Sequence, residues 1–281
     1  MDEQKIIATN LAKNYVIKES GLFGRKKKIV SAVKDITLEI PKGQIIGVLG
    51  INGAGKTTTI RMLASIIAPS SGTLTMNGVD AVKNHRWVKE RINVISGGER
   101  NLYWRLTAIE NLKYFGSLYG LSGVKLKEKI AELLKIVGLE EAKDIPVERY
   151  SKGMKQRLQI ARGLINDPEY IFLDEPTLGL DIVIAKEIRT MIKELAQEGK
   201  KGVLLTTHYI SEAEELCDYI YVLDKGRMIA QGTKEELKDL FASEPKMVLQ
   251  EPGLEEILMK IIYRSRGEDS EENIFGNKSR N

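Results

Sequence analysis

The first residues that could do chemistry form a glycine-rich segment. Residues 50–57 read Gly-Ile-Asn-Gly-Ala-Gly-Lys-Thr, which is the spacing of a P-loop. The backbone N–H groups of such a loop converge on phosphate oxygens, and the helix that follows adds the positive end of its dipole. Lys56 would reach the β- and γ-phosphates of a nucleotide, and the Thr57 hydroxyl would bind Mg²⁺. The predicted nucleotide-binding residues are Gly50, Ile51, Asn52, Gly53, Ala54, Gly55, Lys56, Thr57 and Thr58.

The neighbours of this segment favour phosphate binding. An almost wholly apolar run at 44–49 precedes it, as is typical of a strand that is covered on both faces. After it, Ile60, Leu63 and Ile67 recur at helical spacing. Strand, glycine-rich turn and helix are the context in which a P-loop holds phosphate. The alternative is a strand-to-helix turn in which the lysine is accidental.

Two carboxylates end a second predicted strand. Residues 170–173 are apolar, and Asp174 and Glu175 follow them directly. Because side chains alternate along a strand, the two carboxylates point in different directions and can serve different purposes. Asp174 is predicted to bind Mg²⁺ through its water shell, and Glu175 to polarise the attacking water as the general base. Taken alone, the pair could also be solvated acids at an ordinary strand end.

His208, one of two histidines, closes a third strand-like run at 203–207. The carboxyl ends of such strands are where site residues of α/β proteins gather. His208 could therefore contact the γ-phosphate and hold both the water and Glu175 in place. A lone histidine is more often structural, and the functional interpretation depends on the other motifs.

Together these motifs resemble the ATP-binding cassette subunits of ABC transporters, over about residues 6–232. Tyr15 matches the aromatic residue that stacks on adenine in this family; the alternative is an ordinary strand aromatic. Residues 150–157, Tyr-Ser-Lys-Gly-Met-Lys-Gln-Arg, match the family signature, which usually reads Leu-Ser-Gly-Gly-Gln. Residues 178–181, which end at Asp181, resemble the D-loop through which the subunits communicate.

The signature also has a physical sense of its own. Ser151 is a good N-cap, and apolar residues recur after it at helical spacing, so an amphipathic helix with a positive end should start there. The resemblance implies that two subunits stack head to tail, so that each signature completes the ATP site of the other. Lys152 and Met154 depart from the usual pattern, and Lys152 stands where glycine allows close backbone approach. The residues predicted to meet the partner's ATP are Ser151, Lys152, Gly153 and Met154.

A second departure concerns a further Mg²⁺ ligand. The family carries a glutamine after the strand that corresponds here to residues 92–95, whereas this chain continues Ser-Gly-Gly-Glu-Arg-Asn. Gly98 or Glu99 occupies that neighbourhood, and Glu99 could bind the cation in its place. The next residues, with Tyr103 and Trp104, are similar to an exporter-type subgroup (ABC-2-like) whose membrane subunits are encoded separately. These aromatics either line the groove for a permease helix or pack beneath a helical insert.

These residues must be positioned by strands and helices. Strand-like and helical runs alternate along the sequence, which predicts an α/β fold with a parallel sheet covered by helices. The resemblance implies the core sheet of a P-loop NTPase, of the ABC ATPase type, with an N-terminal antiparallel β portion and an inserted helical subdomain. We expect the insert at about 100–165 and an exposed loop at 19–28. One nucleotide-binding domain should cover 1–240, and an extension with a short helix and a polar tail should cover 241–281.

Composition limits the class of protein. A chain of 281 residues with 42% apolar side chains is long enough for a sizeable core. Its 43 basic and 39 acidic residues nearly cancel, which removes the main argument for nucleic-acid binding. The single cysteine, Cys217, excludes an internal disulfide and fits a reducing cytosol. No apolar window is long enough to predict a membrane span, so we expect a cytoplasmic protein, peripheral on the cytoplasmic face of the membrane.

The resemblance implies a subunit that hydrolyses ATP with Mg²⁺, as a homodimer or with a paired cassette subunit, and drives export through integral membrane permease subunits. One alternative is a non-transport ABC ATPase of the DNA-repair, chromosome or ribosome type. Repair types carry a long coiled coil between P-loop and signature, which this chain lacks, and ribosomal types usually carry two cassettes, whereas this chain has one. The other alternative is a regulatory cassette that binds ATP with little turnover, against which Lys56, Asp174, Glu175 and His208 argue.

Overall fold

The computed structural model describes residues 4–21, 24–97, 101–197 and 200–239. The extension expected at 241–281 and the candidate ligand Glu99, with its neighbour Gly98, lie outside the described residues. The elements follow the chain as β1 (Lys5–Gly21), β2 (Gly24–Pro41), β3 (Ile45–Leu49), α1 (Lys56–Leu63), β4 (Ser71–Met76), β5 (Val79–Asp80), α2 (His85–Lys89), β6 (Ile92–Ser96), α3 (Ala108–Leu118), α4 (Gly123–Ile136), the 3₁₀ helix η1 (Val147–Arg149), α5 (Lys152–Gly163), β7 (Tyr170–Asp174), α6 (Ile182–Gln197), β8 (Gly202–Thr207), α7 (Ile210–Leu216), β9 (Tyr219–Asp224), β10 (Arg227–Gly232) and α8 (Lys234–Asp239).

Within these residues the strands form one sheet of ten, in the order β5-β4-β1-β2-β10-β9-β3-β8-β7-β6. The central strands β9, β3, β8, β7 and β6 run parallel, whereas β1, β2, β4 and β5 pair antiparallel at the other end. Parallel strands deliver their carboxyl ends to one edge of a sheet. This edge therefore receives the P-loop after β3, the carboxylates at the end of β7 and His208 after β8.

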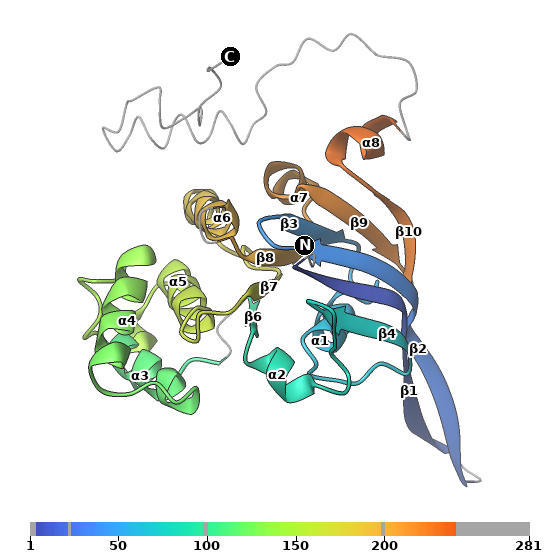
Figure 1. Ribbon diagram of the computed structural model, residues 1–281, viewed down its shortest axis with the longest axis horizontal. Coiled ribbons are helices and arrows are strands. Elements are labelled where there is room, and N and C mark those ends of the chain that lie inside the picture. Colours follow the sequence, from blue (N-terminus) through green and yellow to red (C-terminus); the bar gives the residue numbers. More distant parts are fainter. Residues whose placement is uncertain (1–3, 22–23, 98–100, 198–199, 240–281) are drawn as a thin grey trace.

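The parallel strands are apolar because both of their faces are covered (Figure 1). Along β7, Tyr170 and Phe172 pack into a core with α1 and the N-terminal strands, whereas Ile171 and Leu173 pack into a second core with α3, α4, α5 and α6. Side chains that alternate at period two thus serve two cores from one strand. Between β6 and β7 the chain forms α3, α4 and α5, where the helical insert is expected.

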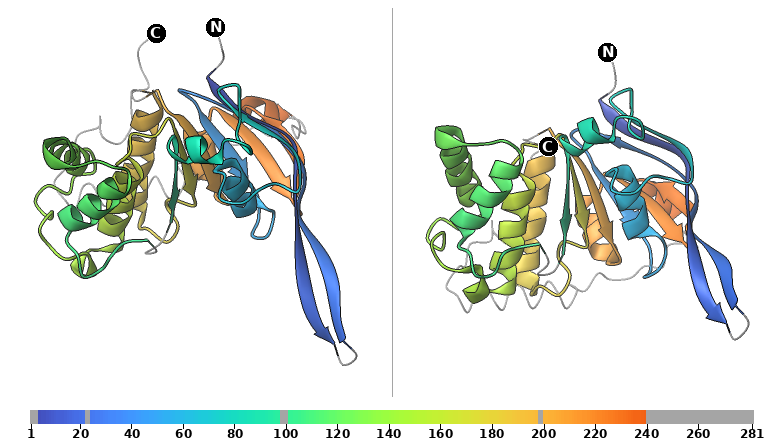
Figure 2. Two further views of the ribbon diagram at one scale, coloured as in Figure 1. Left: turned by 60° about the horizontal axis from the view of Figure 1, so that its bottom comes forward. Right: turned by 90° about the horizontal axis from the view of Figure 1, so that it is seen from below.

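The prediction of an exposed loop at 19–28 is wrong. In the structure β1 continues to Gly21 and β2 begins at Gly24, and their residues pair in register from Tyr15–Val30 to Gly21–Gly24. The two strands leave the sheet as a long hairpin (Figure 2). A run of charged residues argues against a strand, and so for a loop, only where one face of that strand would have to be buried. A two-stranded hairpin in solvent has no such face, so its charges are compatible with pairing.

The helix after the P-loop is also shorter than the apolar spacing predicts. It ends at Leu63, and Ser65 adopts a left-handed conformation with a φ of 53° that turns the chain away from the helix. Ile67 still packs against the core that contains α1, although it lies beyond the helix. In the described part of the chain, no helix is both long and apolar enough to cross a bilayer.

Candidate active site

The P-loop joins β3 to α1 in a conformation that depends on glycine. Gly53 and Gly55 have φ values of 85° and 107°, in the left-handed region that side chains rarely adopt. A Cβ atom on Gly50 would lie 2.5 Å from the Leu223 carbonyl oxygen, and one on Gly55 would lie 2.8 Å from that of Ala32. Gly55 is the N-cap of α1 and has no side chain with which to cap the first turn. The N–H groups of that turn are thus available to an anion.

A cavity of about 510 Å³ opens over this loop. Its volume lies in the range of ordinary small-molecule sites. Gly50 and Ile51 are not among the residues that line it; their carbonyl groups contact Lys56 instead. The lining residues are Val30, Ser31, Ala32, Lys34, Asn52, Gly53, Ala54, Gly55, Lys56, Thr57, Thr58, Glu175 and Lys225.

Tyr15 lies near this cavity but does not line it. It stands opposite Val30 in the ladder between β1 and β2, and Val30 belongs to the lining. The ring is 37% exposed, and the Lys13 ammonium lies 5.5 Å from its centroid. The geometry therefore places Tyr15 one strand away from the rim, on the same hairpin.

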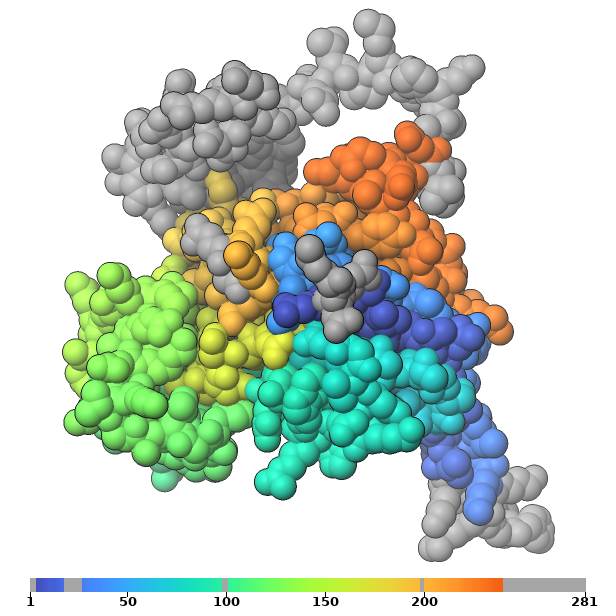
Figure 3. All heavy atoms as spheres, in the orientation of Figure 1, coloured from blue at the N-terminus to red at the C-terminus, as the bar shows by residue number. Residues whose placement is uncertain are grey.

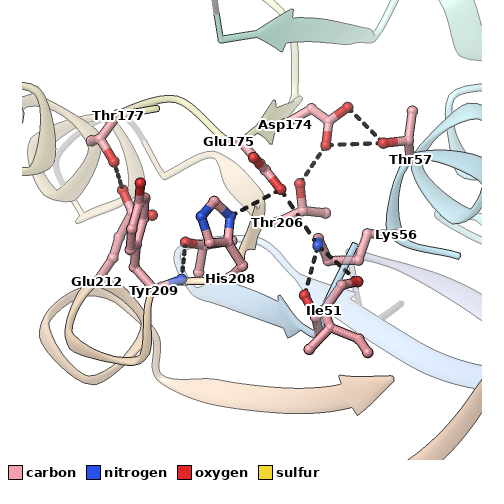
Figure 4. A network of polar contacts seen from close by, with 12 residues as sticks. Ile51, Lys56, Thr57, Asp174, Glu175, Thr177, Thr206, His208, Tyr209 and Glu212 are labelled. Carbon is pink, nitrogen blue, oxygen red and sulfur yellow. Dashed lines mark hydrogen bonds and ion pairs between the residues drawn. The ribbon is translucent and has the colours of Figure 1, made fainter. Parts of the chain in front are cut away.

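Lys56 is the cation at the centre of the site (Figure 4). Its side chain is only 6% exposed, and its ammonium donates to the Gly50 carbonyl at 2.6 Å. The same Nζ atom lies 3.4 Å from Oε1 of Glu175. Lys56 thus connects the P-loop to the end of β7 and presents a positive charge to the cavity.

Asp174 lies beside Thr57, as the sequence predicts for two ligands of one cation. The Thr57 hydroxyl donates to the Asp174 carboxylate at 3.1 Å, and the Thr206 hydroxyl donates to its other oxygen at 2.6 Å (Figure 4). A hydroxyl and a carboxylate are hard oxygen donors of the kind that Mg²⁺ takes from proteins, with phosphate supplying further ligands. In the described part of the chain no cluster of three or more His, Cys, Asp or Glu side chains could hold a metal. The Thr57 hydroxyl and the Asp174 carboxylate are oxygen donors whose chemistry fits a magnesium ion.

Glu175 leaves the strand in an unusual conformation. Its φ is 52°, a left-handed value for a residue with a side chain, and its N–H donates to the Thr206 carbonyl at 3.0 Å. Such backbone strain is concentrated at functional sites and persists only where neighbours impose it. As a result the carboxylate of Glu175 turns away from that of Asp174 and toward Lys56 and His208 (Figure 4).

His208 lies against Glu175. Its Nδ1 lies 3.2 Å from Oε1 of Glu175, and its ring packs on that of Tyr209 with centroids 4.1 Å apart. The structure thus brings Lys56, Thr57, Asp174, Glu175 and His208 to one edge of the sheet.

The signature residues lie elsewhere, and none of them lines the cavity. Ser151 caps α5, with its hydroxyl accepting from Met154 N–H at 3.2 Å. A Cβ atom on Gly153 would lie 2.7 Å from the Ile184 side chain, so α5 and α6 are in close contact there. The Lys152 side chain covers Gly179 of the predicted D-loop, and Asp181 accepts from Ile184 N–H at 3.0 Å.

Three features of the site escape prediction from the sequence. Thr206 is one, although it could have been found as the one of the two threonines ending β8 that is in register with Asp174. Gly97 is another, because its N–H donates to the Asp174 carbonyl at 2.8 Å and no motif marks it. Lys34 and Lys225 line the cavity from β2 and from the turn before β10, where nothing in their local sequence indicates a site.

Comparisons with known proteins agree with this geometry. The family model described as ABC transporter matches residues 33–178. The ABC transporter ATP-binding protein NatA of Bacillus subtilis (strain 168) is 46% identical over 222 residues, which are 79% of this chain and 90% of that protein. The Nod factor export ATP-binding protein I of Cupriavidus metallidurans is 43% identical over 207 residues, 74% of this chain and 68% of that protein.

A similar solved structure is a dimeric ATP-binding cassette in a post-hydrolysis state, bound to ADP and Pi. Its TM-score is 0.70 at 26% identity, over 81% of this chain and 98% of that one.

Proposed function

Because this chain belongs to the ABC transporter family, we propose that it closes as a dimer around two ATP molecules and drives export through separate membrane subunits. The chain is an ATP-binding and ATP-hydrolysing subunit of the exporter-type transporters. The single observation that supports the proposed chemistry best is that Lys56 and Glu175 line one cavity 3.4 Å apart, while His208, outside that lining, lies 3.2 Å from Glu175.

Hydrolysis requires a water held in line with the terminal phosphate. Glu175 is the base that accepts the proton of this water, since its carboxylate faces the cavity from the end of β7. His208, at 3.2 Å, fixes the orientation of that carboxylate and contacts the terminal phosphate. Lys56 and the N–H groups at the start of α1 stabilise the negative charge that is redistributed over the phosphate oxygens.

Mg²⁺ is the proposed cofactor. Thr57 and Asp174 would hold it, since their oxygens lie 3.1 Å apart beside the P-loop. When bound, the ion neutralises charge on the phosphate oxygens. Thr206 positions the Asp174 carboxylate through its 2.6 Å hydrogen bond, so that one carboxylate oxygen remains directed toward Thr57.

The position of the signature supports the proposed dimer. Ser151 and the first turn of α5 form a capped, positive helix end that does not line the cavity of its own chain. A two-fold axis that sets two copies head to tail would bring this helix end to the partner's nucleotide. The similar solved cassette is itself dimeric, which supports this arrangement. We propose that the second subunit is either an identical copy or a paired cassette.

The membrane partner is an integral permease subunit, and we propose that the cassette binds it on the cytoplasmic face. The name of the Nod factor relative supports the export direction. Tyr103 and Trp104 are 46% and 47% exposed, and with Tyr114 they form an aromatic surface on the helical insert that could receive a permease helix.

The proposal is tested by Glu175→Gln. This variant keeps the P-loop and the Asp174–Thr57 pair, so it should bind Mg·ATP, fail to hydrolyse it and accumulate as a dimer in size-exclusion chromatography with light scattering. The matched control is Lys56→Ala, which should stay monomeric because the phosphate site has lost its cation. A Glu175→Gln protein that binds ATP and remains monomeric would contradict the dimer mechanism.

A further inference from the structure

The hairpin of β1 and β2 extends well beyond the sheet. We call residues 15–21 and 24–31 the ribbon. The neighbouring strand β4 pairs with β1 only up to Ala12, and β10 pairs with β2 at Asp35, so among the described residues the ribbon strands pair only with each other. Seven residues of extended chain reach roughly 23 Å. Figure 3 shows the blue residues at the base of the ribbon protruding from the rest of the molecule.

The ribbon carries the excess charge of the whole protein. Residues 18–28 contain five basic residues and one acidic residue, Glu19, which is an excess of four positive charges. The formal net charge of the complete chain is also +4, so the remaining residues balance. The basic residues of the ribbon are Lys18, Arg25, Lys26, Lys27 and Lys28.

This arrangement is costly for a hairpin that stands alone in water. Lys18 and Lys27 are paired directly across the ladder, and like charges at such positions are destabilising. Val16 and Ile29 also face each other in the ladder and are 61% and 69% exposed. Isolated two-stranded hairpins are marginally stable at best. An acidic surface with apolar contacts beside it would remove both costs.

The ribbon starts at the nucleotide cavity. Val30, Ser31 and Ala32 of β2 line that cavity, and the same strand continues outward into the ribbon. In the right-hand view of Figure 2 the ribbon projects past the carboxyl ends of the parallel strands, the side on which the cavity lies. Whatever covers the cavity must therefore lie next to the ribbon.

In the proposed dimer, the cover is the start of the partner's α5. The residues that lead into it have an acidic excess: 140–149 contain four carboxylates against two basic residues, Lys143 and Arg149. We call them the acidic segment. All four carboxylates are exposed, and Ser151 follows within three residues of the last one. When Ser151 of one copy reaches the cavity of the other, the acidic segment must come with it. Its carboxylates belong to Glu140, Glu141, Asp144 and Glu148.

We propose that, in the ATP-bound dimer, the ribbon of each copy lies against the acidic segment of the other copy and clamps the two together. The inference rests on the proposed dimer and adds to it a contact outside the nucleotide site. An anionic membrane would also attract a basic ribbon, but it would not explain why four exposed carboxylates precede the helix that closes the cavity.

The test is a charge swap in the Glu175→Gln background, where the dimer with ATP is long-lived. One variant carries Arg25→Glu and Lys27→Glu, a second carries Glu140→Lys and Glu141→Lys, and a third carries all four changes. Each two-residue variant should raise the dissociation constant of the ATP-bound dimer by about tenfold, since reversed charges replace attraction by repulsion. The four-residue variant should return it to within about twofold of the parent, because the signs match again.

We expect the substitutions to leave the fold and the nucleotide site intact. Arg25 stands opposite Ser20, and Lys27→Glu turns the like-charge pair with Lys18 into a pair of opposite charges, so the hairpin gains stability. None of the four residues lines the cavity, so ATP affinity of the monomer should not change. A matched control, Lys89→Glu with Lys113→Glu, reverses two charges on exposed residues of α2 and α3 and should leave the dimer unchanged.

Two results would overturn the inference while the dimer itself stands. In the first, none of the charge swaps changes the dissociation constant of the ATP-bound dimer. In the second, a ribbon variant dimerises normally but no longer binds vesicles with anionic lipid, which would assign the ribbon to the membrane. Absence of any dimer in the Glu175→Gln parent would instead refute the proposed function and this inference together. Recovery in the four-residue variant alone supports the contact.

Discussion

Gly97 lies so close to Glu175 that a Cβ atom at position 97 would overlap the Glu175 carbonyl oxygen. Gly97 also donates its N–H to the Asp174 carbonyl at 2.8 Å. The residue after β6 therefore supports, through its backbone, the left-handed conformation in which Glu175 leaves β7. Backbone atoms just beyond β6, rather than a side chain, thus hold the conformation that sets the direction of the Glu175 carboxylate.

Gly97→Ala should impair catalysis more than binding. The added methyl must displace the Glu175 backbone, and a displaced base should lower the turnover number by about tenfold or more. Nucleotide affinity should change little, because Gly97 does not line the nucleotide cavity. Measurement of kcat and of the ATP dissociation constant separates the two effects.

A control for general destabilisation is Gly116→Ala in α3. There the added methyl meets the Leu126 side chain, far from the carboxylates, and should lower stability without a specific loss of turnover. Equal turnover in the Gly97→Ala protein and the wild type would show that Gly97 does not position Glu175.

Thr206→Val should weaken the Mg²⁺ site. Thr206 is fully buried, and its hydroxyl donates to the Asp174 carboxylate at 2.6 Å. The isosteric valine removes this donor, which should cost about 1–3 kcal/mol of unfolding free energy and raise the Mg²⁺ concentration needed for half-maximal ATPase activity. Urea unfolding and a Mg²⁺ titration measure the two effects.

Thr206→Ser is the matched control, because it keeps the hydroxyl while removing a methyl group. It should retain the Mg²⁺ dependence of the wild type. If both variants shift the titration equally, the effect comes from packing and the hydrogen bond to Asp174 is not responsible.

Thr177→Val should destabilise the protein through Glu212. The Glu212 carboxylate is 1% exposed and accepts from the Thr177 hydroxyl at 2.7 Å, while its other oxygen has no hydrogen-bond partner among the described residues. Loss of the donor leaves a buried carboxylate unpaired, at a cost of about 3 kcal/mol. Chemical denaturation tests this. The double variant Thr177→Val with Glu212→Gln should recover part of the loss, and a fully stable Thr177→Val protein would contradict the buried pair.

Much of the site follows from the sequence because its motifs are local. The P-loop places Lys56 and Thr57 within a run of eight residues, and Asp174 and Glu175 follow a strand that delivers both to the edge where parallel strands end. The structure brings these residues within hydrogen-bonding distance across more than a hundred positions. Their roles in catalysis stay predictions.

What the sequence does not predict depends on contacts between distant segments. Thr206 acts only through its register opposite Asp174, and Gly97 only through the approach of β6 to the end of β7. The loop prediction at 19–28 fails for another reason. Its charged residues show no alternation of apolar and polar side chains that would predict a strand, yet β1 and β2 pair there in the structure.

Tyr150→Phe should change how stability depends on pH above neutrality. Burial, and then the negative charge of Asp144, raises the pKa of Tyr150 to about 12, against about 10 in the unfolded chain. The unfolded state thus loses this proton first, and the stabilisation is complete below pH 10 and lost as pH rises toward 12. At pH 7 the variant should be about 1 kcal/mol less stable, since the hydroxyl donates to the Ala142 carbonyl at 2.7 Å. Between pH 10 and 12 that difference should shrink in urea unfolding, because phenylalanine does not titrate while the other tyrosines do so in both proteins. A difference that stays constant with pH would mean that Tyr150 ionises equally easily in the folded and unfolded states.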